Sequence, residues 1–374
     1  MKPLNLEFDQ QNWQTARTNW QAWWDNQLER PLVICEGYHN SWKKSHPDAP
    51  KKPNWTFAGI YPLNMPVETV LDRYQEILEA AFFLGDGLPK FYVNIGPGVM
   101  AALLGARYKF VDRSTWFSPP VTSNGISLEQ VALEKIDLAF NEEHPLWLRI
   151  CDLTRAAVER WGSQLTYGMT DLGGNLDILA SLVGAQRLAL EFHDHPQEVE
   201  RLCTQIRHAW LTCYERLHAI FEGANMGSSG WSCLWAPTRM YMLQSDFAYM
   251  ISPAMFKRFV LPDLEECCRA LSYPFYHLDG KGQIRHLEHL LSLEKLRGIQ
   301  WIPGDGAPPA NEWLPLLKRI RDGGKLCQVY VTADGAHKIV NELGGKGFAL
   351  EIEEELTREQ AEKLVEELTS ESHE

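Results

Sequence analysis

Residues 276–309 read YHLDGKGQIRHLEHLLSLEKLRGIQWIPGDGAPP and contain one complete unit of the architecture that we expect for the whole chain. An apolar run ends at Asp279. A segment with apolar residues at helical spacing follows, and a second apolar run over 298–303 then ends in a glycine-rich loop at 304–306. The order strand, loop, helix, strand, loop predicts parallel strands joined by helices.

Two ionisable residues end the first of these strands. Residues two apart in a strand lie on the same face, so His277 and Asp279 are expected to point the same way. Packing alone does not account for two such side chains on the inner face at the end of a buried strand. We therefore interpret this stretch as the floor of an active site.

Apolar runs of strand length alternate with helical patterns along the rest of the chain, and no break in composition marks an inter-domain linker. The predicted strands are 31–38, 91–95, 165–170, 227–235, the run ending at 279, 298–303, 326–332 and 347–353. This pattern predicts an α/β protein with a (β/α)8 TIM barrel and long early loops. We expect a helical cap over residues 1–30 and a single barrel domain over residues 31–374.

A doubly wound sheet is the competing architecture. It would place a glycine-rich phosphate loop after the first strand. The only similar stretch, Gly96-Pro97-Gly98, lacks the spacing, and Pro97 removes an amide that a phosphate would need.

Composition narrows the class of protein. The chain has 374 residues, 45% of them hydrophobic, and a formal net charge of -13, which argues against nucleic-acid and anionic-membrane partners. The polar start shows no export signal and no run is long enough to span a membrane, so a cytoplasmic protein with reduced thiols at its eight cysteines is expected. Fourteen tryptophans suggest core packing, with an aromatic ligand cage as the alternative.

Catalytic groups of a TIM barrel lie at the carboxyl ends of its strands. Here those ends carry an acidic set with one histidine and one thiol: Glu36, Tyr38, Asn94, Asp171, Ser232, Cys233, His277, Asp279, Asp305, Tyr330, Glu351 and Glu353. Several of them have structural alternatives. Asp171 and Asp305 could serve merely to form turns, Cys233 could be a small core residue, and Glu351 and Glu353 could be solvated in a frayed last strand.

Three chemistries fit this set. His277, Asp279 and Cys233 could together hold zinc as a mixed nitrogen, oxygen and sulfur site. His277 could instead act as an acid or base beside Asp279. Asp171 or Asp305 could anchor a cationic or pyrrolic N–H group of a substrate. Spacing alone does not choose among them.

Several segments carry a family resemblance. DLGGNLDILASLVGA from Asp171, HPQEV at 195–199, Asp246 ahead of ISPAMF at 251–256, Pro262 and the HLDG loop at 277–280 resemble the uroporphyrinogen decarboxylase superfamily. The similarity extends from about residue 90 to the C-terminus. It implies a (β/α)8 barrel that either decarboxylates a tetrapyrrole's acetate arms or transfers methyl groups between a small donor or thiol and a corrinoid on a partner protein.

Departures from the family pattern favour the methyltransferase branch. The loop after the first strand, EGYHNSW at 36–42, lacks the arginine with which the decarboxylases grip their polyanionic substrate. His277 and Gly280 match the zinc-binding His-x-Cys-Gly of the methyltransferases. Asp279 replaces the cysteine, and the last strand has no cysteine for a further ligand. A carboxylate activates a zinc-bound thiol less well than thiolate ligands do.

The sequence thus predicts a methyltransferase-like barrel enzyme with a zinc ion, a corrinoid partner, a small-molecule substrate and a homodimeric assembly. His277, Asp279 and Asp171 are the expected catalytic residues, and Cys233 the third metal ligand. The expected substrate-binding residues are Tyr38, Asn94, Trp235, Asp305, Tyr330 and Glu351. A decarboxylase of a small or tetrapyrrole carboxylate, and a non-catalytic ligand-binding barrel, are the alternatives.

Overall fold

The structure, a computed structural model, describes residues 4–370. It is an α/β protein built on a mixed, mostly parallel sheet, in which only β1 and β2 pair antiparallel. The seven strands lie in the order β2 (Ala81–Gly85), β1 (Leu32–Tyr38), β13 (Phe348–Ile352), β12 (Leu326–Val331), β11 (Gly298–Ile302), β10 (Tyr273–Asp279) and β9 (Met240–Gln244).

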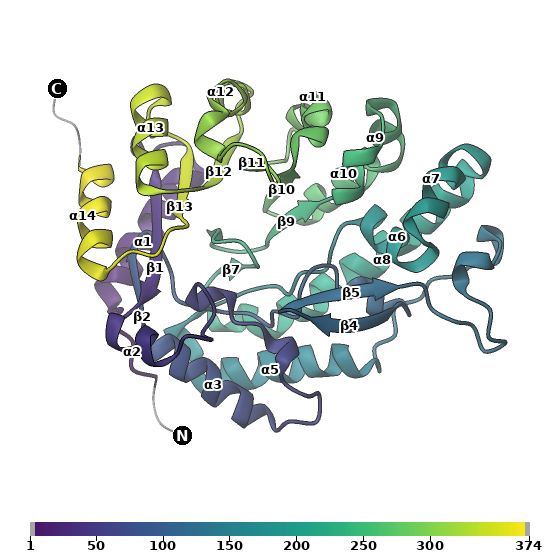
Figure 1. The fold of residues 1–374 in the computed structure, drawn as a ribbon, viewed down its shortest axis with the longest axis horizontal. Coiled ribbons are helices and arrows are strands. Elements are labelled where there is room, and N and C mark those ends of the chain that lie inside the picture. Colours follow the sequence, from purple (N-terminus) through teal and green to yellow (C-terminus); the bar gives the residue numbers. More distant parts are fainter. Residues whose placement is uncertain (1–3, 371–374) are drawn as a thin grey trace.

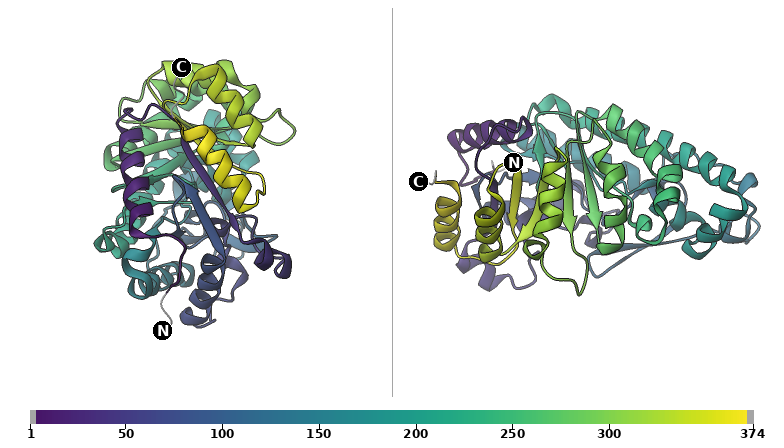
Figure 2. Two further views of the ribbon diagram at one scale, coloured as in Figure 1. Left: turned by 90° about the vertical axis from the view of Figure 1, so that its left-hand side faces the viewer. Right: turned by 90° about the horizontal axis from the view of Figure 1, so that it is seen from above.

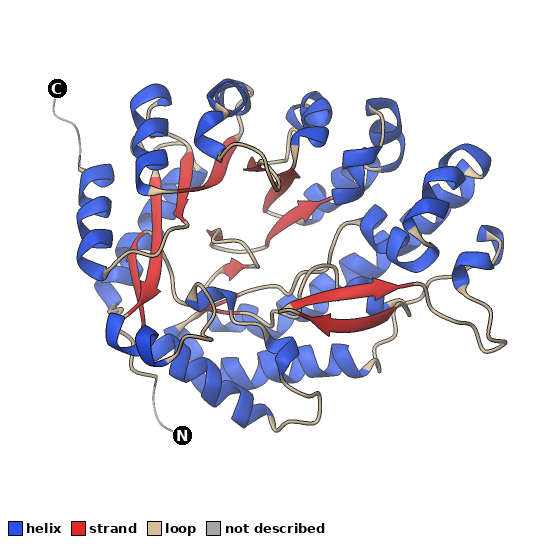
Figure 3. Ribbon diagram, in the orientation of Figure 1, coloured by secondary structure: helices blue, strands red, loops and turns tan. Residues whose placement is uncertain are grey.

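Shorter strands pair outside this sheet. They are β3 (Lys90–Phe91) with β6 (Thr166–Tyr167), β4 (Arg107–Val111) with β5 (Ser114–Ser118), and β7 (Ser228–Ser229) with β8 (Trp235–Ala236). A parallel bridge joins Gly168 to Ser229, so β3, β6 and β7 run side by side. The main sheet curves around the middle of the molecule, and these short strands lie along the lower side of the same arc (Figure 3).

The helices that follow the late strands lie outside the sheet (Figure 1). The helices of the described chain are α1 (Gln10–Trp24), α2 (Asn40–Ser45), α3 (Val67–Glu79), α4 (Met100–Leu103), α5 (Pro145–Trp161), α6 (Asn175–Val183), α7 (Ala185–Asp194), α8 (Pro196–Phe221), α9 (Pro253–Phe259), α10 (Leu261–Ala270), α11 (Leu287–Leu291), α12 (Leu314–Asp322), α13 (Ala333–Leu343) and α14 (Arg358–Thr369). Within residues 4–370, no helix has both the length and the apolar character needed to cross a membrane.

Helix α1 packs its tryptophans into the body of the protein. The Asp9 carboxylate caps the helix by accepting a hydrogen bond from the Asn12 backbone N–H, and the Asn12 side-chain oxygen accepts one from the Asp9 backbone N–H. Trp20, Trp23 and Trp24 are at most 2% exposed. The Trp24 indole also donates to the carbonyl of the distant residue 235. The predicted packing role of these tryptophans is confirmed, while the domain boundary at residue 30 stays a prediction. Helices α1 and α14 lie on different sides of β1 (Figure 2).

Five of the predicted strands are confirmed, the second and third are shortened to β3 and β6, and the fourth is a strand only at Ser228–Ser229 and at its last residue, Trp235. Residues 227–235 form one arm and the turn of the β7–β8 hairpin, and the strand beside β10 is β9 at 240–244. The antiparallel strand β2 was also missed, because residues 81–85 extend the apolar pattern of α3 and only their pairing with β1 makes them a strand. Short apolar runs do not distinguish a buried strand from a helix end.

Candidate active site

The inner face of the main sheet changes character along its strands. Near the strand starts it is apolar and packs against the tryptophans of α1, through Leu32, Ile34, Met240, Met242, Phe275, Leu326 and Ala349. Two residues further along, the same face carries Glu36, Gln244, His277, Gln300, Gln328 and Glu351. One more step reaches Tyr38, Asp246, Asp279, Ile302, Tyr330 and Glu353. Because side chains alternate with period two, the carboxyl end of the sheet collects mostly polar and ionisable groups on one face.

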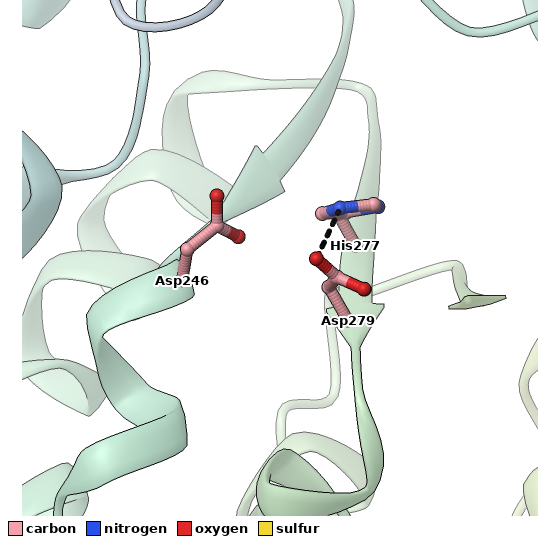
Figure 4. A group of neighbouring side chains, drawn as sticks. All are labelled: Asp246, His277 and Asp279. Carbon is pink, nitrogen blue, oxygen red and sulfur yellow. Dashed lines mark ion pairs between the residues drawn. The ribbon is translucent and has the colours of Figure 1, made fainter. Parts of the chain in front are cut away.

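Three of these groups lie close enough together to hold a metal ion. One side-chain ligand atom from each of Asp246, His277 and Asp279 lies within 4.8 Å of the other two (Figure 4). His277 Nε2 is 3.9 Å from Asp279 Oδ2, and both residues come from β10, as the sequence predicted. Asp246 comes from the turn that follows β9.

Two backbone hydrogen bonds to Asp177 hold Asp246 in place. The residue opens a 3₁₀ helix, Asp246–Met250, and its amide donates to Asp177 Oδ2 at 2.9 Å. The amide of Phe247 donates to the other oxygen of Asp177 at 2.7 Å. The Asp177 carboxylate therefore fixes the first turn, which aims Asp246 at His277. Sequence reasoning missed Asp246 as a ligand because it follows a strand that was not predicted.

His277 is held on two sides. Its Nδ1 contacts the side-chain oxygen of Gln300 on the neighbouring strand. The ring of Trp231 meets the imidazole edge-on, with ring centroids 5.1 Å apart. Burial raises the pKa of the Asp279 carboxyl, His277 lowers it, and Asp246 and Asp305 raise it further. The cluster therefore holds two mutually repelling carboxylates, which a cation would stabilise.

Asp171 lies beside this cluster. The pKa of its carboxyl is raised to about 6, because burial raises it by more than the hydrogen bonds from the amides of Gly173 and Gly98 lower it. Asp246 and His277 are close enough to shift this pKa as well. Its Oδ1 accepts from the Gly173 amide at 2.9 Å. Asp171 therefore both orders the turn at Gly173 and lies next to the cluster.

The pKa of Asp171 leads to a prediction for stability. Because the folded-state pKa is raised above the unfolded value, the stabilising contribution of this group is full below about pH 4 and is lost as pH rises through about 6. Asp171→Asn keeps the hydrogen-bond acceptor but removes the charge. We expect it to raise the free energy of unfolding at pH 7 by on the order of 2 kcal/mol and to leave it nearly unchanged at pH 4. Urea unfolding at both pH values measures this difference.

The matched control is Asp112→Asn, the same change at an exposed residue. It should shift the free energy of unfolding by less than about 0.5 kcal/mol at either pH. An Asp171→Asn protein whose stability follows the wild-type pH profile would show that the buried carboxyl does not titrate as inferred.

A cavity opens next to the cluster. It has a volume of about 540 Å³, and its wall includes His277, Asp279, Asp305, Tyr330 and Glu353. Asp305 is exposed and Tyr330 half-buried. The structure thus brings four of the predicted site residues, His277, Asp279, Asp305 and Tyr330, to one cavity that can admit a small molecule.

A second polar cluster lies deeper on the inner face. Lys52, from the loop after α2, is 3.3 Å from Glu351 Oε1 and donates to the carbonyl of Ile352 at 2.5 Å. Both side chains of this ion pair are 2% exposed. Burial lowers the pKa of the Lys52 ammonium, but Glu351 and Glu36 raise it above its ordinary value. Glu351 is therefore held by a buried ion pair and is not solvated in a frayed strand.

Glu36 and Lys90 complete this second cluster. The pKa of Glu36 is raised to about 7, because burial and the nearby Glu351 raise it by more than Lys52 lowers it. The Lys90 ammonium donates to the carbonyl of Gly230 at 2.9 Å and to that of Ser232. Lys90 thereby ties down the turn that presents Trp231 to the imidazole. The sequence did not identify either lysine as a site residue, because neither lies at the carboxyl end of a predicted strand.

Cys233 belongs to this second cluster and not to the metal-site geometry. Burial raises the pKa of its thiol well above the ordinary value, and Glu351, hydrogen-bonded to the thiol, raises it further. Within residues 4–370, the group of potential ligands around His277 is completed by Asp246 and does not include Cys233. Cys233 was predicted to lie on a strand next to His277. It lies instead in the turn of the β7–β8 hairpin, and therefore it is not a ligand of this group.

The remaining predicted substrate-binding residues lie apart from the cavity beside His277. Trp235 is 4% exposed, packs with the tryptophans of α1 and donates to the carbonyl of Met226 at 2.8 Å. Asn94 is half-buried and accepts from the amide of Gly96 at 3.1 Å. Tyr38 stacks on Trp42 and lines a separate cavity of about 190 Å³. Trp235 is therefore a core residue, and Asn94 orders a turn.

Comparison with solved structures shows a likeness of fold. The chain is similar to a methyltransferase from Methanosarcina mazei. The TM-score is 0.58 and the sequence identity 13%, and the match covers 94% of this chain and 97% of that chain. No family profile and no curated protein matches the sequence. At this identity the likeness concerns the fold, which the two proteins share over nearly their whole length.

Proposed function

We propose that this protein is a metal-dependent methyltransferase whose metal is held by Asp246, His277 and Asp279. The observation that carries the proposal is the convergence of these three ligand atoms at the carboxyl end of the sheet, beside a cavity whose wall includes His277 and Asp279. The fold shared with the Methanosarcina mazei methyltransferase and the superfamily resemblance of the sequence support the reaction class.

The donor set fits zinc. One imidazole nitrogen and two carboxylate oxygens are ordinary zinc ligands, and three protein ligands leave a position for a substrate atom. The two carboxylates would balance the charge of a divalent cation. When bound, zinc would supply Lewis-acid character at the cavity, where it would favour the deprotonated form of a thiol or hydroxyl.

The protein's own side chains have separable roles in this proposal. Tyr330 and Asp305 at the cavity wall would orient a small methyl donor or acceptor. When an acceptor thiol or hydroxyl gains a methyl group, it loses a proton, and the carboxyl of Asp171, with its raised pKa, would hold that proton. The other methyl carrier would be a corrinoid on a partner protein, as the sequence resemblance implies.

We also propose that the strands close into the predicted eight-stranded barrel. The parallel pairing of β3 with β6 and the bridge from Gly168 to Ser229 support closure, because they continue the arc of the main sheet. The successive layers of inward-facing side chains support it as well, since a barrel interior is filled in such layers. The homodimer stays a prediction.

Metal analysis and a transfer assay test the proposal. Protein stripped of metal and then supplied with zinc should bind about one ion per chain. The zinc form should transfer the methyl group of methylcobalamin, used as the probe, to one or more small thiols, which mass spectrometry detects. The stripped form should be inactive. Absence of both zinc binding and methyl transfer would refute the proposal, and carbon dioxide release without a corrinoid would favour the decarboxylase alternative.

A further inference from the structure

Three neighbouring strands present hydrogen-bonding side chains at one level of the inner face. His277 on β10 is in register with Gln300 on β11, and Gln300 is in register with Gln328 on β12. Both glutamines are 0% exposed. Parallel register places their side chains side by side on the face that also carries the candidate metal ligands.

The side chains form a continuous chain of hydrogen bonds. The Gln300 side-chain oxygen contacts His277 Nδ1, and the Gln300 side-chain nitrogen donates to the side-chain oxygen of Gln328. Since its nitrogen is engaged by Gln328, Gln300 turns its oxygen to the imidazole. An acceptor at Nδ1 requires a proton on Nδ1, and a neutral imidazole then has its free lone pair on Nε2.

We propose that Gln300 and Gln328 are positioning residues that hold His277 as the Nδ1–H tautomer and aim Nε2 at Asp246 and Asp279. Ligating histidines ordinarily donate their second N–H to an outer partner, which fixes the ring and its tautomer. Here that partner is a neutral amide. It is oriented by a second amide and not by a carboxylate.

The opposite neighbour of His277 supplies an internal comparison. Gln244 on β9 is in register with His277 on the other side and is also buried. Its side-chain oxygen has no hydrogen-bond partner in the described chain, and no bond joins Gln244 to the imidazole. The positioning role therefore belongs to one of two flanking glutamines, which makes Gln244→Leu a matched control for Gln300→Leu.

Nitrogen-15 NMR of histidine-labelled, metal-free protein reads the tautomer directly. His277→Ala identifies the signals of His277. We expect the Nδ1–H tautomer in the wild type, a mixture or the Nε2–H tautomer in Gln300→Leu, and no change in Gln244→Leu. Gln328→Leu should shift the same equilibrium by a smaller amount, because it removes only the group that orients Gln300. Gln300→Glu offers a carboxylate acceptor and should restore the Nδ1–H tautomer.

Zinc titration provides the second readout, and only this part rests on the proposed function. Gln300→Leu should weaken zinc binding about 10- to 100-fold, whereas Gln244→Leu should bind as the wild type does. An Nε2–H tautomer in the wild type, or an unchanged tautomer in Gln300→Leu, would overturn the inference. The expected tautomers in a protein that binds no zinc would support the positioning role and count against the metal site alone.

Discussion

Protein carrying His277→Ala is expected to lose stoichiometric zinc binding, with its affinity reduced by more than about 100-fold. Removal of an outer hydrogen-bond partner alone changes metal affinity by about 10- to 100-fold, so removal of a ligand should cost more. Without the imidazole, Asp246 and Asp279 remain as two like charges with no neutral donor between them. Metal content after dialysis and a competitive zinc titration measure the loss.

The control for this prediction is a histidine outside the cluster. His337 lies on α13, is partly exposed and is paired with Glu367. His337→Ala should bind zinc with wild-type affinity. Asp246→Asn should weaken binding as Asp279→Asn does, because each removes one carboxylate charge from the same ion. Full zinc occupancy in the His277→Ala protein would refute the assignment of this site.

Lys52→Met is expected to lower the free energy of unfolding by about 3–5 kcal/mol, more than the Asp171→Asn or Lys51→Met substitutions change it. The substitution removes one partner of an ion pair whose side chains are 2% exposed and leaves the charge of Glu351 without its partner in a dry environment. It also removes the hydrogen bond to the Ile352 carbonyl. Urea unfolding at pH 7 measures the change.

The neighbouring lysine supplies the control. Lys51 pairs with Glu353 at 3.5 Å, but both side chains are more than two-fifths exposed. Lys51→Met should therefore cost less than about 1 kcal/mol. The double variant Lys52→Met with Glu351→Leu should be more stable than Lys52→Met alone, because the second substitution removes the buried carboxylate that has lost its partner. Equal stability of the two lysine variants would contradict the buried pairing.

Local sequence patterns predicted most of the architecture. The alternation of apolar strand-length runs with helical periodicity over 276–353 corresponds to β10 through β13 with their intervening helices. The spacing of His277 and Asp279 also sufficed to place both on one face, since the period of a strand is a local property. The fourth strand was misplaced because only the pairing of residues 240–244 with β10 identifies them as the strand there, whereas residues 227–235 fold into the β7–β8 hairpin.

The sequence by itself determined the class of fold, the packing role of the α1 tryptophans and the pair of ionisable residues that ends β10. Tertiary structure alone decided which residues complete the candidate site. Asp246 reaches His277 because the distant Asp177 holds its turn, Lys52 reaches Glu351 from a loop, and Cys233 turns away to the deeper cluster. Strand periodicity depends on neighbouring residues, whereas these contacts depend on register and loop closure between segments far apart in the chain.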